Sequence, residues 1–202
     1  MKIFNKFTSG SAEIIRKNGI GVMPTDTIYG IVCSALSKKA VNEVYRLRKR
    51  SPNKPVIVLI SSLNDLKKFD ISLSAIGHRL LAKLWAGPIS VVLPIASGKS
   101  QMTKLKYLHR GKKAIAFRMP ASAPLRRFLK KTGPLIAPSA NLEGKTPART
   151  IKEAQKYFGD SIDFYIDGGI IKSKPSTLVS MKNGKIFLIR KGAVGKLITD
   201  DL

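Results

Sequence analysis

Short apolar runs alternate with segments of helical periodicity along this sequence, and that alternation restricts the fold to the α/β class. An apolar run that ends at a turn-forming residue is typical of a buried strand, whereas apolar residues three or four positions apart indicate an amphipathic helix. We expect strands over 20–23, 55–60, 89–93, 114–117 and 134–137, and helices over 9–16, 37–47, 76–85, 124–131 and 150–158. The predicted architecture is a mixed sheet with flanking helices, whose strand order the sequence leaves open.

Cap and turn residues give the expected boundaries. Ser9 or Ser11 can cap the first helix, and Thr150 with Glu153 forms a capping box for the last one. The run from 62 to 65 resembles the cap of a further helix. Near the end, residues 177–181 and 186–189 predict a hairpin joined by Asn183-Gly184. No repeat or linker divides the 202 residues, so we expect one domain over 1–202.

Positive charge is large and unevenly distributed. The chain has 37 Lys and Arg against 12 Asp and Glu, a net charge of +25. Between Asp70 and Glu143 there are thirteen Lys or Arg and no acidic residue. A field of this sign attracts polyanions, which favours a nucleotide or RNA partner. The alternative is a basic surface without such a partner.

Several classes of protein are disfavoured. Cys33 is the one cysteine, which excludes an intramolecular disulfide and a multi-cysteine zinc site, and its apolar neighbours predict a buried side chain. His78 and His109 have no spaced ligand partner, so we expect them to be structural or exposed to solvent. No apolar run reaches the roughly 18 residues of a membrane span. A cytoplasmic protein without membrane contact is the expectation.

Three segments carry candidate chemistry. The run PTDTIYG at 24–30 places two hydroxyls, a carboxylate and a phenol after a predicted strand, where α/β ligand sites form; a simple turn is the alternative. The segment 46–54 holds five cations in nine residues, more than a helix C-terminus requires, which favours phosphate binding. Ser139 and Asn141 follow another predicted strand, and could equally form an ordinary turn. Arg118 and Arg190 end two further strands and could be plain surface charges.

Other nucleotide motifs are incomplete. Gly98-Lys99-Ser100 and Gly144-Lys145-Thr146 end like a P-loop, but Leu93 and Ser139 stand where its first glycine is required. A GxGxxG fingerprint and a catalytic triad are also missing from the sequence. Such a chain suits a reaction driven by positioning and charge neutralisation, as nucleotidyl transfer on Mg-ATP is.

Taken in order, the motifs resemble the YrdC family of threonylcarbamoyl-AMP synthases along nearly the whole chain. They are PTDTIYG at 24–30, RKRSPNKP at 48–55, WAGPISVVLP at 85–94, IAFRMP at 115–120, APSANLEGKTP at 137–147, DGG at 167–169, PSTLV at 175–179 and IRKGAV at 189–194. The resemblance implies a twisted mixed sheet with flanking helices around a large basic cavity. It also implies an enzyme, a nucleotidyltransferase that joins L-threonine, bicarbonate and ATP into threonylcarbamoyl-AMP and pyrophosphate. The product serves the threonylcarbamoyl-adenosine modification of tRNA beside the anticodon.

The resemblance also assigns roles to residues. Arg48 and Arg50 would be catalytic, and Mg2+ would be held by ATP and not by protein side chains alone. ATP would contact Arg50, Lys54, Asn141 and Arg190, and threonine would contact Thr27, Arg118, Ser139 and Ser176. Arg48 stands where the family usually has Lys, and Lys54 where many members have Asn. The chain ends soon after Arg190, as in the short form of the family.

The expected partners follow from this activity. They are ATP, L-threonine and bicarbonate, with hand-off of the product to tRNA threonylcarbamoyl-transfer proteins and direct tRNA contact left open. A non-catalytic module that binds double-stranded RNA is the main alternative, and a carbamoyl-transfer relative is a second one.

Overall fold

The structure is a computed structural model, and it describes residues 1–95, 98–182 and 185–195. Its elements along the chain are β1 (Lys2–Phe4), α1 (Ser9–Arg16), β2 (Gly21–Pro24), β3 (Tyr29–Ser34), α2 (Lys38–Leu47), β4 (Ile57–Leu59), η1 (Leu63–Phe69), α3 (Ala75–Leu84), β5 (Ile89–Pro94), α4 (Lys99–Lys104), α5 (Lys106–His109), β6 (Ala114–Arg118), α6 (Ala123–Thr132), β7 (Leu135–Ile136), α7 (Ile151–Phe158), η2 (Gly159–Ser161), β8 (Phe164–Ile166), β9 (Thr177–Lys182) and β10 (Lys185–Arg190). The predicted α/β class is therefore confirmed.

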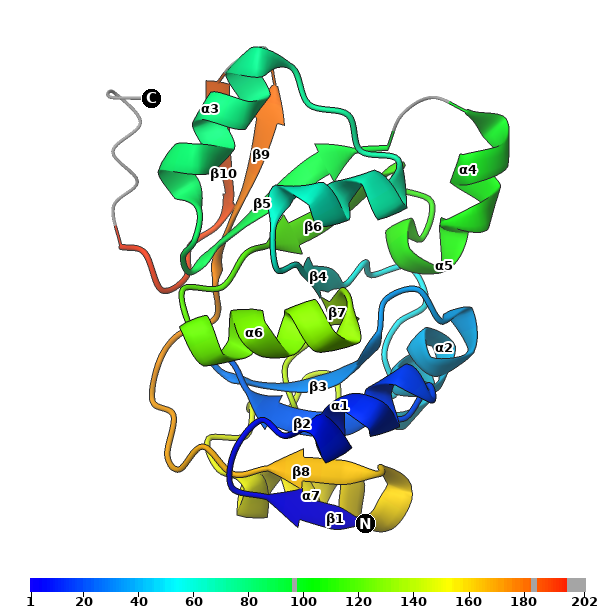
Figure 1. The fold of residues 1–202 in the computed structure, drawn as a ribbon, viewed down its shortest axis with the longest axis vertical. Coiled ribbons are helices and arrows are strands. Elements are labelled where there is room, and N and C mark those ends of the chain that lie inside the picture. Colours follow the sequence, from blue (N-terminus) through cyan, green and yellow to red (C-terminus); the bar gives the residue numbers. More distant parts are fainter. Residues whose placement is uncertain (96–97, 183–184, 196–202) are drawn as a thin grey trace.

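Within the described residues the strands form one mixed sheet in the order β1-β8-β2-β3-β7-β4-β6-β5-β9-β10. The pairs β1–β8, β8–β2, β4–β6 and β5–β9 are parallel, and the others are antiparallel. Figure 1 shows the N-terminal strand β1 and the C-terminal strand β10 at opposite ends of the molecule.

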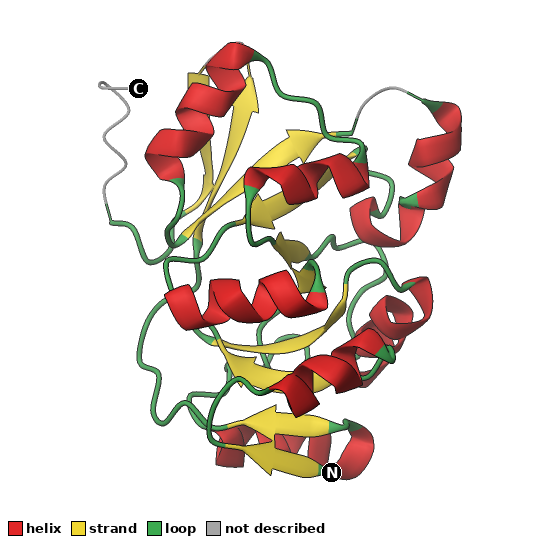
Figure 2. Cartoon of the chain, in the orientation of Figure 1, coloured by secondary structure: helices red, strands yellow, loops and turns green. Residues whose placement is uncertain are grey.

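Strand residues alternate between two apolar clusters, one on each face of the sheet. Val22 and Ile31 enter the larger cluster, while Met23 and Val32 pack with the smaller one beneath α1 and α6. The period-2 alternation of a strand requires this division. Figures 1 and 2 show α1 and α6 in front of the sheet, and Arg16 of α1 donates a hydrogen bond to the Lys131 carbonyl of α6.

Some expected boundaries are corrected. Thr8, and not Ser9 or Ser11, is the N-cap of α1, with Ser11 completing its capping box. The helix expected after residue 62 is the 3-10 helix η1, and Ser62 makes no side-chain cap bond. Thr150 does cap α7, but the Glu153 carboxylate accepts from the Arg149 amide instead of closing the box on Thr150.

The remaining expectations fall as follows. The hairpin of β9 and β10 is confirmed, and its Asn183-Gly184 turn lies outside the described residues. Cys33 is buried, and burial raises the pKa of its thiol. Buried His109 is structural, while His78 is exposed. Of the helices that the structure describes, none has the length and apolar character needed to cross a membrane.

Candidate functional site

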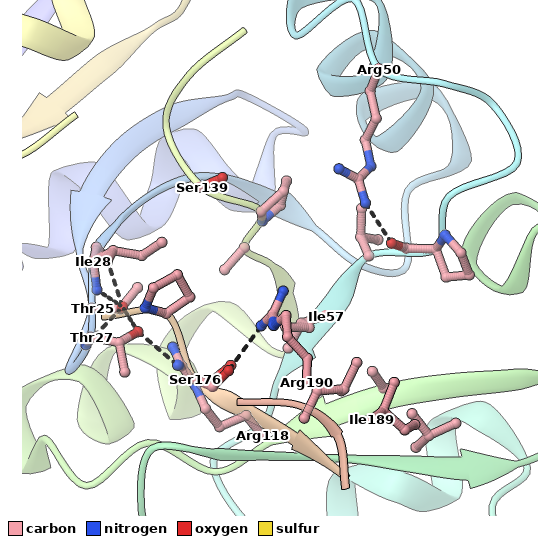
Figure 3. Close-up of a pocket in the computed structure, with 18 of the residues that line it drawn as sticks. Thr25, Thr27, Ile28, Arg50, Ile57, Arg118, Ser139, Ser176, Ile189 and Arg190 are labelled. Atoms are coloured by element: carbon pink, nitrogen blue, oxygen red, sulfur yellow. Dashed lines mark hydrogen bonds between the residues drawn. The ribbon is translucent and has the colours of Figure 1, made fainter. Parts of the chain in front are cut away.

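A cavity of about 520 Å³ lies against strands β4, β6, β5, β9 and β10 and the loops beside them. Its lining combines aliphatic side chains with hydroxyls and cations. The lining residues are Thr25, Thr27, Ile28, Arg50, Pro55, Val56, Ile57, Val92, Lys112, Ala114, Ala116, Arg118, Ala137, Pro138, Ser139, Pro175, Ser176, Leu178, Ile189 and Arg190. Figure 3 shows Thr27 and Arg118 on one side of it, Arg50 on the other, and Arg190 between them.

Strand β6 forms part of the cavity floor because of its alternation. Ile115 and Phe117 point into the larger apolar cluster. Ala114, Ala116 and Arg118 point the other way and line the cavity. The two alanines leave space above the strand, and Arg118 places a cation at its C-terminal end. Residues 115–118 therefore contribute alternately to the apolar core and to the floor of the cavity.

Arg118 is the buried cation at one end of that floor, with 4% of its surface exposed. It donates a hydrogen bond of 2.8 Å to the Thr27 hydroxyl and lies 3.3 Å from the Asp26 carboxylate. Asp26 in turn accepts from the Ala121 amide. Burial lowers the pKa of the Arg118 guanidinium, and the Asp26 carboxylate opposes that shift. The Nε atom of Arg118 is buried without a hydrogen-bond partner among the described residues, so the fork retains capacity for an anion.

The turn that carries Thr27 is ordered by Thr25. The Thr25 hydroxyl donates to the Ile28 carbonyl and accepts from the amides of Thr27 and Ile28. Tyr29, at the end of the same segment, donates its phenol to the Gly169 carbonyl and accepts from the Gly168 amide. These hydrogen bonds join the PTDTIYG and DGG motifs to each other.

Ser176 and Arg190 lie where β9 begins and β10 ends. The Ser176 hydroxyl shares a hydrogen bond of 2.8 Å with Ser90, and Arg190 donates to the Ser176 carbonyl at 2.9 Å. Partial burial lowers the pKa of Arg190. The backbone after β10 closes over this point: the Ala193 amide donates to the Pro175 carbonyl, and a Cβ on Gly192 would lie 2.3 Å from that oxygen. Only glycine fits such an approach.

Arg48 lies behind the cavity wall with 2% of its surface exposed. Its Nε donates to the Asn141 carbonyl, and one terminal nitrogen reaches both the Asn141 side-chain oxygen at 3.1 Å and the Ser139 hydroxyl at 3.3 Å. Burial, followed by repulsion from Arg50, lowers the pKa of the Arg48 guanidinium to about 10. Asn141 uses its amide to donate to the carbonyls of Leu142 and Lys145. The three side chains brace the segment that presents Ser139.

Arg50 and Lys54 belong to the loop that follows α2. Arg50 donates a hydrogen bond of 2.7 Å to the Pro55 carbonyl, and its guanidinium lies 5.7 Å from the centre of the Tyr45 ring. Lys54 forms an ion pair with Glu143, whose carboxylate also accepts from the Ser51 amide. These contacts hold the pKa of Glu143 below its usual range. Glu143 thus connects the loop at 48–55 to the loop at 139–147.

The charges of the lining residues are unbalanced. Arg50, Lys112, Arg118 and Arg190 are cations, and none of the lining residues is acidic. Four cations around aliphatic walls suit a ligand that carries several negative charges on an apolar ring system. Among the described residues there is no group of three His, Cys, Asp or Glu side chains that could hold a metal ion.

The chain is similar to proteins of one family over most of its length. The model for the Sua5/YciO/YrdC family, described as telomere recombination, matches residues 13–192. The chain belongs to this family. Two relatives named threonylcarbamoyl-AMP synthase come from Idiomarina loihiensis, 30% identical over 85% of this chain and 91% of the relative, and Thiobacillus denitrificans, 30% identical over 88% and 93%.

Solved structures of the Sua5/YciO/YrdC family share the fold. A Pyrococcus abyssi Sua5 complexed with L-threonine superposes with a TM-score of 0.79 and is 27% identical, covering 95% of this chain and 58% of that one. The chain therefore spans little more than half the length of this Sua5. Escherichia coli YciO matches 98% of this chain and 97% of its own with a TM-score of 0.81; at 22% identity it supports the fold alone.

The structure brings most of the predicted site residues together. Those that line the cavity are Thr27, Arg50, Arg118, Ser139, Ser176 and Arg190. Arg48, Lys54 and Asn141 do not line it, and the Arg48 guanidinium is enclosed behind Ser139, so the catalytic role of Arg48 stays a prediction. In this structure Lys54 is engaged by Glu143 and Asn141 by its own loop. Their ATP contacts stay predictions.

Sequence reasoning missed Asp26 as the partner of Arg118 and Lys112 as a lining cation. For Lys112 strand alternation gives no signal, because the residue lies before β6 and the left-handed backbone of Lys113 interrupts the period-2 pattern. For Asp26 there was none, since its partner is 92 positions away in the sequence.

Proposed function

We propose that this protein is an L-threonylcarbamoyladenylate synthase, a nucleotidyltransferase that converts L-threonine, bicarbonate and ATP into threonylcarbamoyl-AMP, pyrophosphate and water. The observation that supports it most is a single cavity with Arg118, Thr27 and Ser176 at one side and Arg50 at the other. The first group suits an amino acid's carboxylate and hydroxyl, and the second suits phosphates. The names of the relatives agree with this assignment.

In the proposed reaction the threonine amine adds to carbon dioxide derived from bicarbonate and loses a proton, which gives a carbamate. A carbamate oxygen then attacks the α-phosphorus of ATP, the bond to the β-phosphate oxygen breaks, and pyrophosphate leaves with the electron pair. Arg118 holds the threonine carboxylate, while Arg50 and Arg190 neutralise charge on the phosphates. Arg48 supports Ser139 from behind as a positioning residue. The aliphatic walls keep water from the labile adenylate.

Mg2+ fits this site as an ion carried by the nucleotide. The lining has no carboxylate to ligate it, whereas ATP supplies phosphate oxygens, which Mg2+ prefers. Bound there, it would neutralise part of the phosphate charge. Delivery of the product to tRNA threonylcarbamoyl-transfer proteins, and direct contact with tRNA, belong to the same proposal. A cavity of this polarity favours a small anionic substrate over the RNA-binding alternative, which needs only a basic surface.

One assay tests the activity. The protein is incubated with labelled ATP, bicarbonate and Mg2+, with or without threonine, and pyrophosphate is measured. Threonine should stimulate pyrophosphate release, and an equal rate without it refutes the proposal. Arg50→Ala should abolish turnover with an unchanged circular dichroism spectrum, because within the described part of the chain its guanidinium donates to the Lys54 and Pro55 carbonyls and lies near the Tyr45 ring, contacts that the fold does not depend on. Wild-type activity in this variant would contradict the site assignment.

A further inference from the structure

Lys112 lines the cavity but has no role in the proposed reaction so far. It lies two residues before β6, whose Ala114, Ala116 and Arg118 also line the cavity, so that the two alanines have a cation on either side of them along the chain. At about 3.3 Å per residue, Ala114 and Arg118 stand roughly 13 Å apart along the strand. The two cations therefore serve opposite ends of the cavity.

The backbone that carries Lys112 is held in an uncommon conformation. Arg110, Gly111 and Lys113 all have positive φ angles, of 49°, 87° and 57°. Buried His109 stabilises this loop: one ring nitrogen accepts from the Gly111 amide, and the other bonds to the Met102 carbonyl. Non-glycine residues in the left-handed region cost free energy and persist where the surroundings enforce them.

The same loop is attached to the one that bears Arg50. The Arg110 guanidinium stacks 3.8 Å from the centre of the Tyr45 ring and donates to Asn42. Arg50 lies near the same ring, and the Tyr45 phenol donates to the Lys54 carbonyl. Tyr45 therefore contacts both the loop that carries Arg50 and the loop that carries Lys112. We expect Lys112 to lie at the same part of the cavity as Arg50.

Lys112 also has no counter-charge. It takes part in none of the ion pairs among the described residues, and no acidic residue occurs in the sequence between Asp70 and Glu143. An exposed lysine at the rim of a cavity without acids is available to an anion. The amino-acid end already has Arg118. We infer that Lys112 binds the β- and γ-phosphates of the nucleotide and holds the pyrophosphate that leaves; this inference rests on the proposed function.

Calorimetric titration with MgATP, magnesium pyrophosphate and AMP tests the inference. Lys112→Met is compared with Lys113→Met, which removes the same charge from the neighbouring residue that does not line the cavity. Lys112→Met should weaken ATP and pyrophosphate about tenfold, the effect of one charged hydrogen bond, and leave AMP unchanged. Lys113→Met should bind all three like the wild type, and Lys112→Arg should restore pyrophosphate binding.

The outcomes separate the two proposals. If Lys112→Met binds pyrophosphate as tightly as Lys113→Met does, or loses AMP and ATP affinity equally, the role of Lys112 is refuted while nucleotide binding by the wild type stands. If the wild type binds neither ATP nor pyrophosphate, the proposed function fails, and the role of Lys112 falls with it.

Discussion

Removal of the Asp26 charge should expose how strongly the buried pair with Arg118 supports the site. Asp26→Asn keeps the shape of the side chain and leaves Arg118 as a buried cation whose remaining hydrogen bond is to Thr27. At 3.3 Å and an effective dielectric constant of about 20, the attraction lost is about 5 kcal/mol. Because Arg118 keeps its hydrogen bond to Thr27, we expect the low end of buried-pair losses, about 3 kcal/mol of unfolding free energy.

Thermal unfolding measures this loss. For a chain of this length, 1 kcal/mol corresponds to roughly 2–4 °C, so Asp26→Asn should lower Tm by roughly 6–12 °C. Asp70→Asn is the matched control, since it removes the same charge from an exposed carboxylate in a left-handed turn that asparagine tolerates. Its Tm should stay close to that of the wild type.

A double-mutant cycle then tests the cause. The double variant Asp26→Asn, Arg118→Gln removes both charges, so no unpaired ion stays buried. Its loss of unfolding free energy should be smaller, by at least about 1 kcal/mol, than the sum of the losses in the two single variants. Threonine binding should stay lost in the double variant, because the guanidinium is gone. A Tm for Asp26→Asn within about 2 °C of the control, or strict additivity in the cycle, would refute the reasoning.

Two further variants address the segments around the cavity. Gly192→Ala should weaken threonine binding and lower Tm, because its Cβ would lie 2.3 Å from the Pro175 carbonyl oxygen; Gly195→Ala, which meets nothing within 4 Å, should do neither. Glu143→Gln should be less stable than the wild type at neutral pH. The contacts with Lys54 and the Ser51 amide lower the pKa of Glu143, so its contribution exists above about pH 4.5 and is lost as pH falls below that value. Denaturant unfolding should therefore show the two proteins converging in acid, and a constant difference would contradict this role of Glu143.

The fold class could be predicted from the sequence because each expected run had a strong period of its own. The strand β3, by contrast, has apolar residues on both faces and so shows no alternation, and β1 and β8 are only three residues long. The strand order depends on pairings such as β3 with β7, which are about a hundred residues apart. Such long-range pairings leave no local pattern in a single sequence.

Motifs at the ends of predicted strands pointed to Thr27, Arg118 and Ser139, which line the cavity, whereas Ser176 was indicated by the family resemblance alone. The local sequence does not show whether a side chain of such a motif points into the cavity or into the protein behind it. Arg48 and Arg50 are two positions apart, yet one is enclosed behind Ser139 and the other lines the cavity.

Most of the basic residues of the chain lie outside the cavity. Four of the 37 Lys and Arg line the cavity, so the substrate site alone does not account for an excess of +25. The thirteen basic residues between Asp70 and Glu143 nevertheless include Lys112 and Arg118, and the absence of acids there keeps the floor of the cavity free of competing carboxylates. The same bias that steers polyanions toward the surface therefore also leaves Lys112 unpaired at the rim. The carboxylate of Asp26 pairs with Arg118 but does not line the cavity, so it does not compete with an anionic ligand there.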